Sequence, residues 1–444
     1  MNARSFILFF SLVAAPVAAQ QADTTVARTL APAGERIGLP DAIARSLRVV
    51  PTAVQAQGTV RNAAAQERVA YGAFLPNINA SSNGSKSFSE LPSRTDPSTG
   101  QLITSNSNIG LSMGLNASVD LWTGLRRGAD ISAAHATQRS AEAGVVNAQF
   151  QVRLQVTQAY LDALAARQTV EVRVASVRRA MEQLKVSVAK LRAGSATRSD
   201  SLRSEVNLGN ARIALINAEI QQATAEASLG RLTGAGGRVE AIDDSTYYLP
   251  AQIDTTGLRA EAHASAPQIL SADASENAAR AQVRSAYAAY SPTLTLSGSY
   301  NFNGSSRTFA DNPLYNSRNI QLGLNWPLFN RFSRERNVVT ADVAADNARA
   351  NAADAVRLVD AGVTQQLVQL TAAQLRIGIT RSSVLAARED IRVIGERYRL
   401  GAATIVDLLT SQEALTQAEV DAVNARFDYL RAKAQVEALI GRSL

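Results

Sequence analysis

Three stretches of the chain alternate between apolar and polar residues, the pattern of β-strands with two different faces. Residues 109–121 alternate without a break, and residues 293–302 and 320–328 alternate again later in the chain. The strand expected before residue 109 is weakly marked, by Ile78 and Ala80. About ten alternating residues is the length of a transmembrane β-strand, although a strand of a soluble sheet would alternate equally well.

The residues around these stretches favour the membrane alternative. Small polar residues such as Gly110, Ser112 and Asn116 lie between the apolar ones, as on strands that face a water-filled lumen. Long segments rich in Ser, Asn, Pro and Thr, residues 84–108 and 303–319, are expected as loops between paired strands. A soluble sheet would explain neither feature.

Each strand region is followed by a helical stretch of unusual length, residues 123–193 and 330–400. At 1.5 Å of rise per residue, about 70 residues form a rod of about 100 Å. Shorter helices are predicted at residues 39–74, ending before Pro76, and at 198–233. Their combined length matches one long helix, so we expect two short helices stacked end to end beside each long one.

Apolar residues on these helices recur at steps of four and three, which predicts coiled-coil seams. The stripes indicate structural packing and imply no cofactor. The predicted seam residues are Val170, Val174, Val177, Met181, Leu184, Val188 and Leu191 on the first long helix, Leu202, Val206, Ile213, Ile216 and Ile220 on the helix after it, and Val420, Val423, Phe427, Leu430 and Ala434 near the end of the chain.

The whole pattern occurs twice. Gly194 aligns with Gly401 and Asp200 with Asp407 at an offset of 207 residues, whereas Pro51 aligns with Pro267 at an offset of 216. The nine extra residues belong in an exposed loop of the first copy. The predicted domains are an N-terminal linker at 20–38, a first repeat at 39–235, a second linker at 236–252 and a second repeat at 253–441.

The N-terminal residues have the pattern of an export signal. Arg4 precedes an apolar run from Phe6 to Ala15, and small residues up to Ala19 lead into a polar segment. This is the order of a secretory signal peptide, predicted at residues 1–19. The chain has no cysteine, so no disulfide, thiolate metal site or lipid-anchored N-terminus is expected. No later apolar run reaches the roughly 20 residues of a spanning helix, so a membrane crossing must use strands.

Composition argues against two other classes of protein. The net charge of +7 is spread along the helices without basic runs, so no nucleic-acid partner is expected. The two histidines, His135 and His263, have no acid–base or metal-binding neighbours in sequence, and the glycine-rich segment 234–237 follows a helix rather than a strand. We therefore expect no enzyme active site, no metal and no cofactor.

The strand count requires an assembly. Two repeats supply four strands at one end of the rods, with the helix turns at the other end, whereas membrane barrels need at least about eight strands. Unpaired sheet edges are prohibitive in lipid. The chain is therefore expected to close its barrel by oligomerisation.

Three motifs resemble the TolC-type outer membrane efflux protein family. They are the helix opening Leu39–Ile43 that runs on to Pro76, the strand-to-helix passages Val119–Trp122 and Trp326–Phe329, and the helix tip Tyr398–Leu409. The resemblance covers nearly all of the mature chain and implies an α+β membrane protein of two tandem repeats, each with two transmembrane strands and long coiled-coil helices. In this family a homotrimer forms a 12-stranded β-barrel in outer membrane lipid, with an α-helical barrel in the periplasm.

The resemblance also implies a function. Such proteins are exit ducts of tripartite efflux or type I secretion systems, without catalytic activity. A periplasmic adaptor (membrane fusion) protein and an inner-membrane pump of the RND, ABC or MFS type load them. The alternative for this chain is a soluble periplasmic coiled-coil adaptor. The sequence names neither the cargo nor the pump.

Several residues match functional positions of the family. Asp407 and Thr410 match the periplasmic gate, where Thr410 replaces a second acid, and Tyr398 and Asp200 match a link between the helical hairpins. Gly194 and Gly401 mark the helix-tip turns, and Trp122, Trp326 and Phe329 mark the barrel end. Both aspartates also stand in the pattern of a capping box, Thr197 to Asp200 and Thr404 to Asp407. Capping alone explains Asp200, whereas both roles are open for Asp407.

Overall fold

Two long helices run through the helical part of the molecule. The computed structural model describes residues 34–88, 94–95, 97–98, 100, 102–103, 108–243, 257–306 and 314–442, so the predicted signal peptide lies outside them. Helices α3 (Arg126–Arg192) and α7 (Ser333–Arg399) have 67 residues each, which corresponds to about 100 Å. Each turns back into a 36-residue helix, α4 (Arg198–Thr233) or α8 (Ile405–Ile440), so the predicted rods and hairpins are confirmed.

Shorter helices complete each rod, and one predicted helix is interrupted. Instead of a single helix over residues 39–74, the chain forms α1 (Leu39–Val49) and α2 (Pro51–Gly72). The backbone of Val50 is extended, with ψ 127°, because Pro51 has no N–H to donate and disfavours a helical residue before it. The second repeat breaks in the same way at Pro267, between α5 (Leu258–Ser265) and α6 (Pro267–Tyr287).

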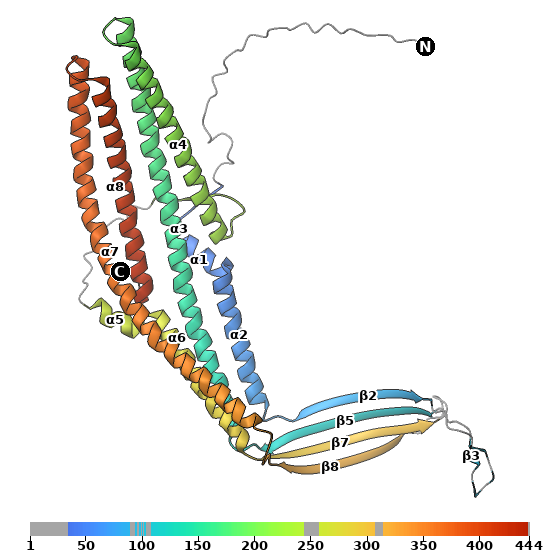
Figure 1. The fold of residues 1–444 in the computed structure, drawn as a ribbon. Coiled ribbons are helices and arrows are strands. Elements are labelled where there is room, and N and C mark those ends of the chain that lie inside the picture. The colour runs from blue at the N-terminus through green and yellow to red at the C-terminus, as the bar shows by residue number, and fades with distance from the viewer. Residues whose placement is uncertain are drawn as a thin grey trace, which may run out of the picture.

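The stacking of short helices beside the long ones agrees with the prediction. Figure 1 shows α4 and α2 end to end along α3, and α8 and α6 in succession along α7. The contacts between elements give the order α4, α3, α8, α7 toward the helix tips, and α2, α3, α6, α7 nearer the strands. The chain is therefore an open arc, with α4 or α2 at one edge and α7 at the other.

Four antiparallel strands project from one end of the rods, in the order β2-β5-β7-β8. The predicted loops 84–108 and 303–319 are too long, because strands extend into both of them. The weakly marked first strand is a full strand, since its pairing with β5 is made by the backbone and needs no apolar side chain. The strands are β2 (Asn77–Ser87), β5 (Asn108–Trp122), β7 (Thr293–Ser306) and β8 (Tyr315–Asn325), and two-residue strands β3 (Arg94–Thr95) and β4 (Leu102–Ile103) pair between β2 and β5.

The register gives the sheet one polar and one apolar face. One cross-strand row consists of Asn79, Asn116, Ser299 and Asn319, and the next row consists of Ala80, Leu115, Tyr300 and Arg318. A bulge between Asp120 and Trp122 shifts the register where β5 approaches the helices. The alternation predicted from the sequence is therefore confirmed on β5 and β7, and on β8 as far as Asn325, where the strand ends before the predicted residues 326–328.

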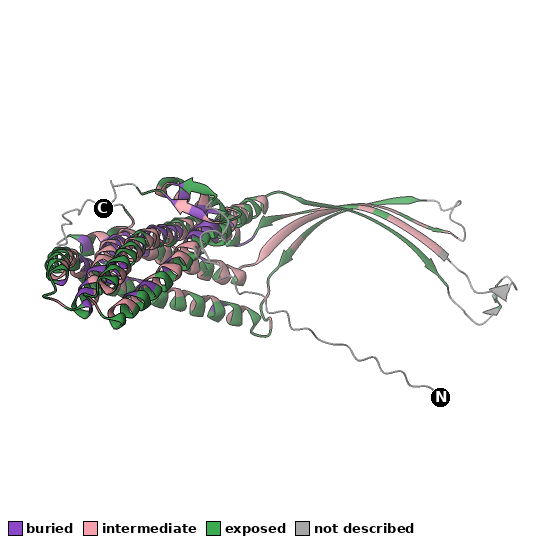
Figure 2. Cartoon of the chain, turned by 90° about the horizontal axis from the view of Figure 1, so that it is seen from above, coloured by how far each residue is buried: buried purple, intermediate pink, exposed green. Residues whose placement is uncertain are grey.

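The core lies in the helical part, where Figure 2 shows the buried residues gathered, while β2, β5, β7 and β8 are exposed or intermediate. Tyr160, Leu229, Phe427 and Ile440 are among its fully buried side chains. The described parts of the two predicted linkers contribute to this core, since β1 (Glu35–Ile37) pairs in parallel with β6 (Val239–Ala241) and Ile37, Val239 and Ala241 are buried in it. None of the helices in the described ranges has a stretch long and apolar enough to cross a bilayer.

The predicted seams are only partly correct. On α8, Phe427 and Leu430 are buried as expected. On α4, however, Leu202, Val206, Ile213 and Ile220 are 50–64% exposed. The helix buries a different row, which includes Ser204, Leu208 and Ala218, and leaves the predicted row on the free edge of the arc. The Ser187 and Ser204 hydroxyls, 2.8 Å apart, form part of the actual contact between α3 and α4.

Candidate gate at the helix tips

Both hairpins turn at a glycine in the left-handed conformation. Gly194 has φ +72° and Gly401 has φ +79°, a region that side chains with a Cβ rarely adopt. The N–H of the residue after each glycine donates to a carbonyl five residues earlier, from Ser195 to Lys190 at 2.9 Å and from Ala402 to Arg397 at 2.7 Å. The glycines therefore lie where they were predicted, one at each helix tip.

Both return helices begin with a capping box. The N–H of Thr197 donates to the Asp200 carboxylate at 3.0 Å, and the N–H of Asp200 donates to the Thr197 hydroxyl at 3.2 Å. Thr404 and Asp407 make the same pair of bonds at 2.9 and 3.2 Å. The capping role inferred from the sequence is thus confirmed for both aspartates.

The Asp407 carboxylate accepts a further hydrogen bond in addition to those of its capping box. It accepts the Thr404 backbone N–H and also the Thr404 hydroxyl at 2.8 Å. These donors, the backbone one first, hold the pKa of the Asp407 carboxyl below its usual range, and Arg397 acts in the same direction. The side chain remains exposed, and so does Thr410, whose hydroxyl donates to the Val406 carbonyl at 2.9 Å. Asp407 is therefore a fixed, solvent-facing negative charge at the tip.

Tyr398 and Asp200, which were predicted to link the helical hairpins, are not hydrogen-bonded to each other. Asp200 is engaged in its capping box, and the buried Tyr398 hydroxyl has no hydrogen-bond partner in the described part of the chain. Instead, the Lys190 ammonium of α3 donates to the Tyr398 carbonyl at 2.6 Å and lies 4.1 Å from the centroid of the Tyr398 ring. Lys190 thereby joins the first hairpin to the last turn of α7.

A second polar contact between the repeats lies further from the tip. The Arg179 guanidinium of α3 donates to the Thr416 hydroxyl at 3.0 Å and to Glu419 of α8 at 3.2 Å. Glu419 also accepts Arg388 of α7 at 3.5 Å. No sequence signal pointed to Lys190 or Arg179, because their partners lie more than 200 residues away along the chain.

The aromatic residues predicted at the barrel end lie at the junction between strands and helices. Trp122 is the last residue of β5, Trp326 follows β8, and all three predicted aromatics are exposed. The Trp326 indole N–H donates to the Tyr290 carbonyl at 3.3 Å, and Phe329 meets Phe332 edge to face at 5.5 Å. Exposed aromatics at this level are typical of a membrane interface.

An arginine braces this junction in each repeat. Arg127 donates to the Asp120 carbonyl at the end of β5 and stacks on Phe74 at 4.7 Å. Arg334 donates to the Pro327 carbonyl at 2.6 Å and stacks on Tyr290 at 4.5 Å. Each arginine therefore ties the incoming helix, the strand end and the outgoing helix together.

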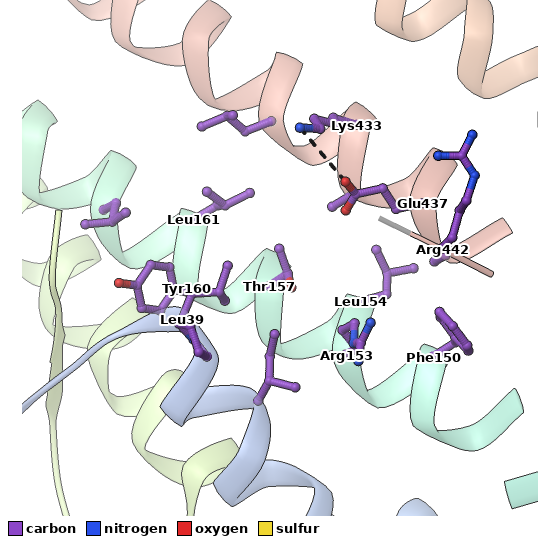
Figure 3. A pocket seen from close by; sticks show the side chains of 16 residues that line it. Leu39, Phe150, Arg153, Leu154, Thr157, Tyr160, Leu161, Lys433, Glu437 and Arg442 are labelled. Carbon is purple, nitrogen blue, oxygen red and sulfur yellow. Dashed lines mark ion pairs between the residues drawn. The ribbon is translucent and has the colours of Figure 1, made fainter. Parts of the chain in front are cut away.

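A cavity of about 510 Å³ lies between α1, α3 and α8 (Figure 3). Leu154, Leu161 and Leu39 line it, and the Lys433–Glu437 ion pair, at 4.0 Å, lies on its wall. The Tyr160 hydroxyl is used structurally, since it donates to the Ile242 carbonyl at 2.5 Å. In the part of the chain that the structure covers, no three His, Asp or Glu side chains are grouped so as to hold a metal ion.

Comparison with known proteins identifies the architecture. The family model described as "Outer membrane efflux protein" matches residues 43–235 and 258–442. The outer membrane efflux protein BepC of Brucella suis is 25% identical over 379 residues, covering 83% of this chain and 79% of that protein. The pyoverdine export outer membrane protein OpmQ of Pseudomonas aeruginosa is 27% identical over 395 residues, covering 86% and 80%.

Solved structures share the fold. The CmeC outer membrane channel of Campylobacter jejuni superimposes with a TM-score of 0.75 at 19% identity, covering 91% of this chain and 85% of that one. The outer membrane protein VceC of Vibrio cholerae gives a TM-score of 0.72 at 18% identity, covering 91% and 96%. The predicted fold of two repeats, each with a strand pair and long helices, is confirmed.

Proposed function

The chain belongs to the outer membrane efflux protein family, and on that premise we propose that it is the exit duct of a tripartite efflux or type I secretion assembly. It is an outer membrane channel and not an enzyme. The alternative of a soluble periplasmic adaptor is wrong, because the family match spans both repeats and the solved channels share the fold. Relatives include a pyoverdine export protein and the alkaline protease secretion protein AprF, so export of small molecules and secretion of proteins both occur among them.

Channels of this family are trimers that work with efflux machinery. The open arc of the chain supports threefold closure here: β2 and β8 are unpaired edges of the sheet, while α4 and α7 are the edges of the helical layer. Three copies would give a 12-stranded barrel without unpaired edges, as lipid requires. Further partners we propose are a periplasmic adaptor and an inner-membrane pump of the RND, ABC or MFS type.

The gate that we propose is a ring of three Asp407 carboxylates where the helix tips converge. The observation that supports it is the exposed Asp407 carboxylate, held ionised by two Thr404 donors. Three like charges around one bore attract cations and repel anions. Thr410 lies one turn further along α8 and adds no charge, so one acidic ring is expected.

The test is single-channel recording in planar bilayers with Asp407→Ala. Removing the ring should raise conductance and lower the preference for cations. Asp200→Ala is a matched control, since it removes the equivalent capping box, which contributes about 1 kcal/mol to helix stability, from the other hairpin. Equal effects of the two substitutions, or no effect of Asp407→Ala, would contradict the proposed gate. Neither result would contradict the proposal that the protein is a channel.

A further inference from the structure

The two faces of the four-stranded sheet carry different charges. The apolar face contains every second residue of β5 from Ile109 to Val119, together with the residues paired with them on β2, β7 and β8. On this face, within the strand residues that the structure describes, the only charged side chains are Lys86 of β2 and Arg318 of β8. Asp120 lies on the opposite face, where it accepts the Thr295 hydroxyl at 2.7 Å.

Both cations lie toward the strand ends that are remote from the helices. Arg318 is seven residues from Asn325, the helix-side end of β8, which is about 24 Å along the strand. With the usual strand tilt of roughly 40°, Arg318 lies about 18 Å above the helix-side end of β8 along the membrane normal. The apolar band on the outside of a membrane barrel is about 25 Å tall. Lys86 is the penultimate residue of β2. Both side chains therefore lie at the level of the outer half of the membrane.

Each cation stacks on an aromatic ring of the same face. The Arg318 guanidinium lies 5.2 Å from the centroid of the Tyr300 ring, and the Lys86 ammonium lies 5.0 Å from that of Phe88. At this level the residues of β2 and β8 become small or polar, namely Ser82, Gly84 and Asn316. A Cβ built on Gly84 would meet nothing within 4 Å. The surroundings of the two cations thus have room for a polar headgroup.

Lys86 and Arg318 lie on the two edge strands, so threefold closure brings β8 of one copy against β2 of the next. We propose that each of these seams, with Arg318 of one copy and Lys86 of its neighbour, binds the phosphate groups of a phosphorylated glycolipid in the outer leaflet. A cation on a lipid-facing surface needs a counter-charge, and phosphate oxygens match the donors of a guanidinium. The inference rests on the proposed threefold assembly.

The experiment compares trimer stability in nanodiscs of three compositions: phosphatidylcholine alone, phosphatidylcholine with bisphosphorylated lipid A, and phosphatidylcholine with lipid A stripped of its phosphates. The readout is the temperature at which the trimer band dissociates on a semi-native gel. Phosphorylated lipid A should raise this temperature for the unsubstituted protein. Neither the stripped lipid nor free inorganic phosphate added to the neutral nanodiscs should raise it.

The double variant Lys86→Gln with Arg318→Gln should lose this rise. Lys185→Gln, which removes an exposed lysine near the helix tips, should keep it, and so should the charge-retaining variant Lys86→Arg with Arg318→Lys. Should the double glutamine variant fail to assemble, Arg318→Gln alone should show a reduced rise.

Two results would overturn the proposal. One is an equal rise in the unsubstituted protein and the glutamine variants. The other is destabilisation of the glutamine variants by the same amount in all three compositions, which would show that the two cations stabilise the trimer through the protein and not through a lipid phosphate. An unsubstituted protein that gives no trimer band would instead contradict the threefold assembly.

Discussion

Lys190 donates to a carbonyl in the last turn of α7, where helix carbonyl groups lack partners within the helix and the helix dipole is negative. The contact therefore stabilises the end of one hairpin through a side chain of the other. A hydrogen bond to a charged group contributes about 1.5–3 kcal/mol, reduced here because Lys190 is partly exposed. It is strong enough to bias the position of the second hairpin.

We expect Lys190→Met to increase the open probability of the channel up to roughly tenfold, because about 1.4 kcal/mol corresponds to that factor. Single-channel recording measures this directly. Lys185→Met is the matched control, since Lys185 lies on the same helix and pairs with Glu182 alone among the described residues. An unchanged open probability in Lys190→Met would show that the contact does not hold the gate.

Tyr398→Phe distinguishes this contact from the link expected from the sequence. The substitution keeps the ring and the carbonyl that Lys190 contacts and removes a hydroxyl without a partner in the described structure. We expect open probability and inward leak of large antibiotics to stay unchanged. An increased leak would instead support a hydrogen bond from Tyr398 to Asp200 in the closed channel.

The lowered pKa of Asp407 predicts how selectivity depends on pH. Because the Thr404 donors stabilise the carboxylate, the cation preference should disappear at a lower pH than it would without them, in the acidic range where aspartates become protonated, about 4. Thr404→Ala removes the hydroxyl donor and should move the midpoint to higher pH. Thr410→Ala, which removes a nearby hydroxyl bound to Val406, should leave the midpoint in place. Reversal potentials between pH 3 and 6 measure the shift.

Single residues were predictable where their partners are local. The capping boxes at Asp200 and Asp407 follow from residues three apart, and the turns at Gly194 and Gly401 follow from the need for a positive φ. Lys190 was missed because its contact depends on how α3 and α7 are aligned across the repeats. That alignment comes from packing of the whole core, which no local pattern encodes.

At the scale of elements, Arg127 and Arg334 hold each strand end against the helices that adjoin it. Arg334→Lys keeps the charge but loses the planar guanidinium, whose two nitrogens donate to the Pro327 and Leu328 carbonyls at 2.6 and 3.1 Å and which stacks on Tyr290. We expect the dissociation temperature of the trimer to fall, since net losses of about 1 kcal/mol per hydrogen bond recur in three copies. Arg336→Lys, two residues away and exposed, serves as the control. Equal dissociation temperatures for the two variants would show that the contacts of Arg334 do not stabilise the junction.

The elements themselves show what a pattern can and cannot reveal. The alternation of β5 and the length of α3 and α7 were sufficient to predict these elements. β2 was underestimated because its pairing uses backbone groups, and the interruption at Pro51 was missed because the apolar pattern continues across it. The α4 seam had the expected spacing, but spacing does not tell which neighbour it packs against.

In the whole molecule, the exposed apolar row of α4 is available to a neighbouring copy. We expect Val206→Glu combined with Ile213→Glu to prevent trimer formation, because two unpaired carboxylates buried at an interface cost several kcal/mol. Arg212→Glu, about 100° around the same helix, is the control. Cross-linking and size-exclusion chromatography in detergent measure the oligomer, and a normal trimer in the double variant would place this row outside the interface.

The unpaired edges of β2 and β8 also bear on how the protein reaches the membrane. A single copy cannot enter lipid alone, because its open sheet would leave backbone groups without partners. Insertion and assembly are therefore one event, and its yield rises steeply with the concentration of exported chains. The same coupling makes defects dominant: when normal and defective copies mix, the fraction of intact channels falls as the cube of the fraction of normal copies.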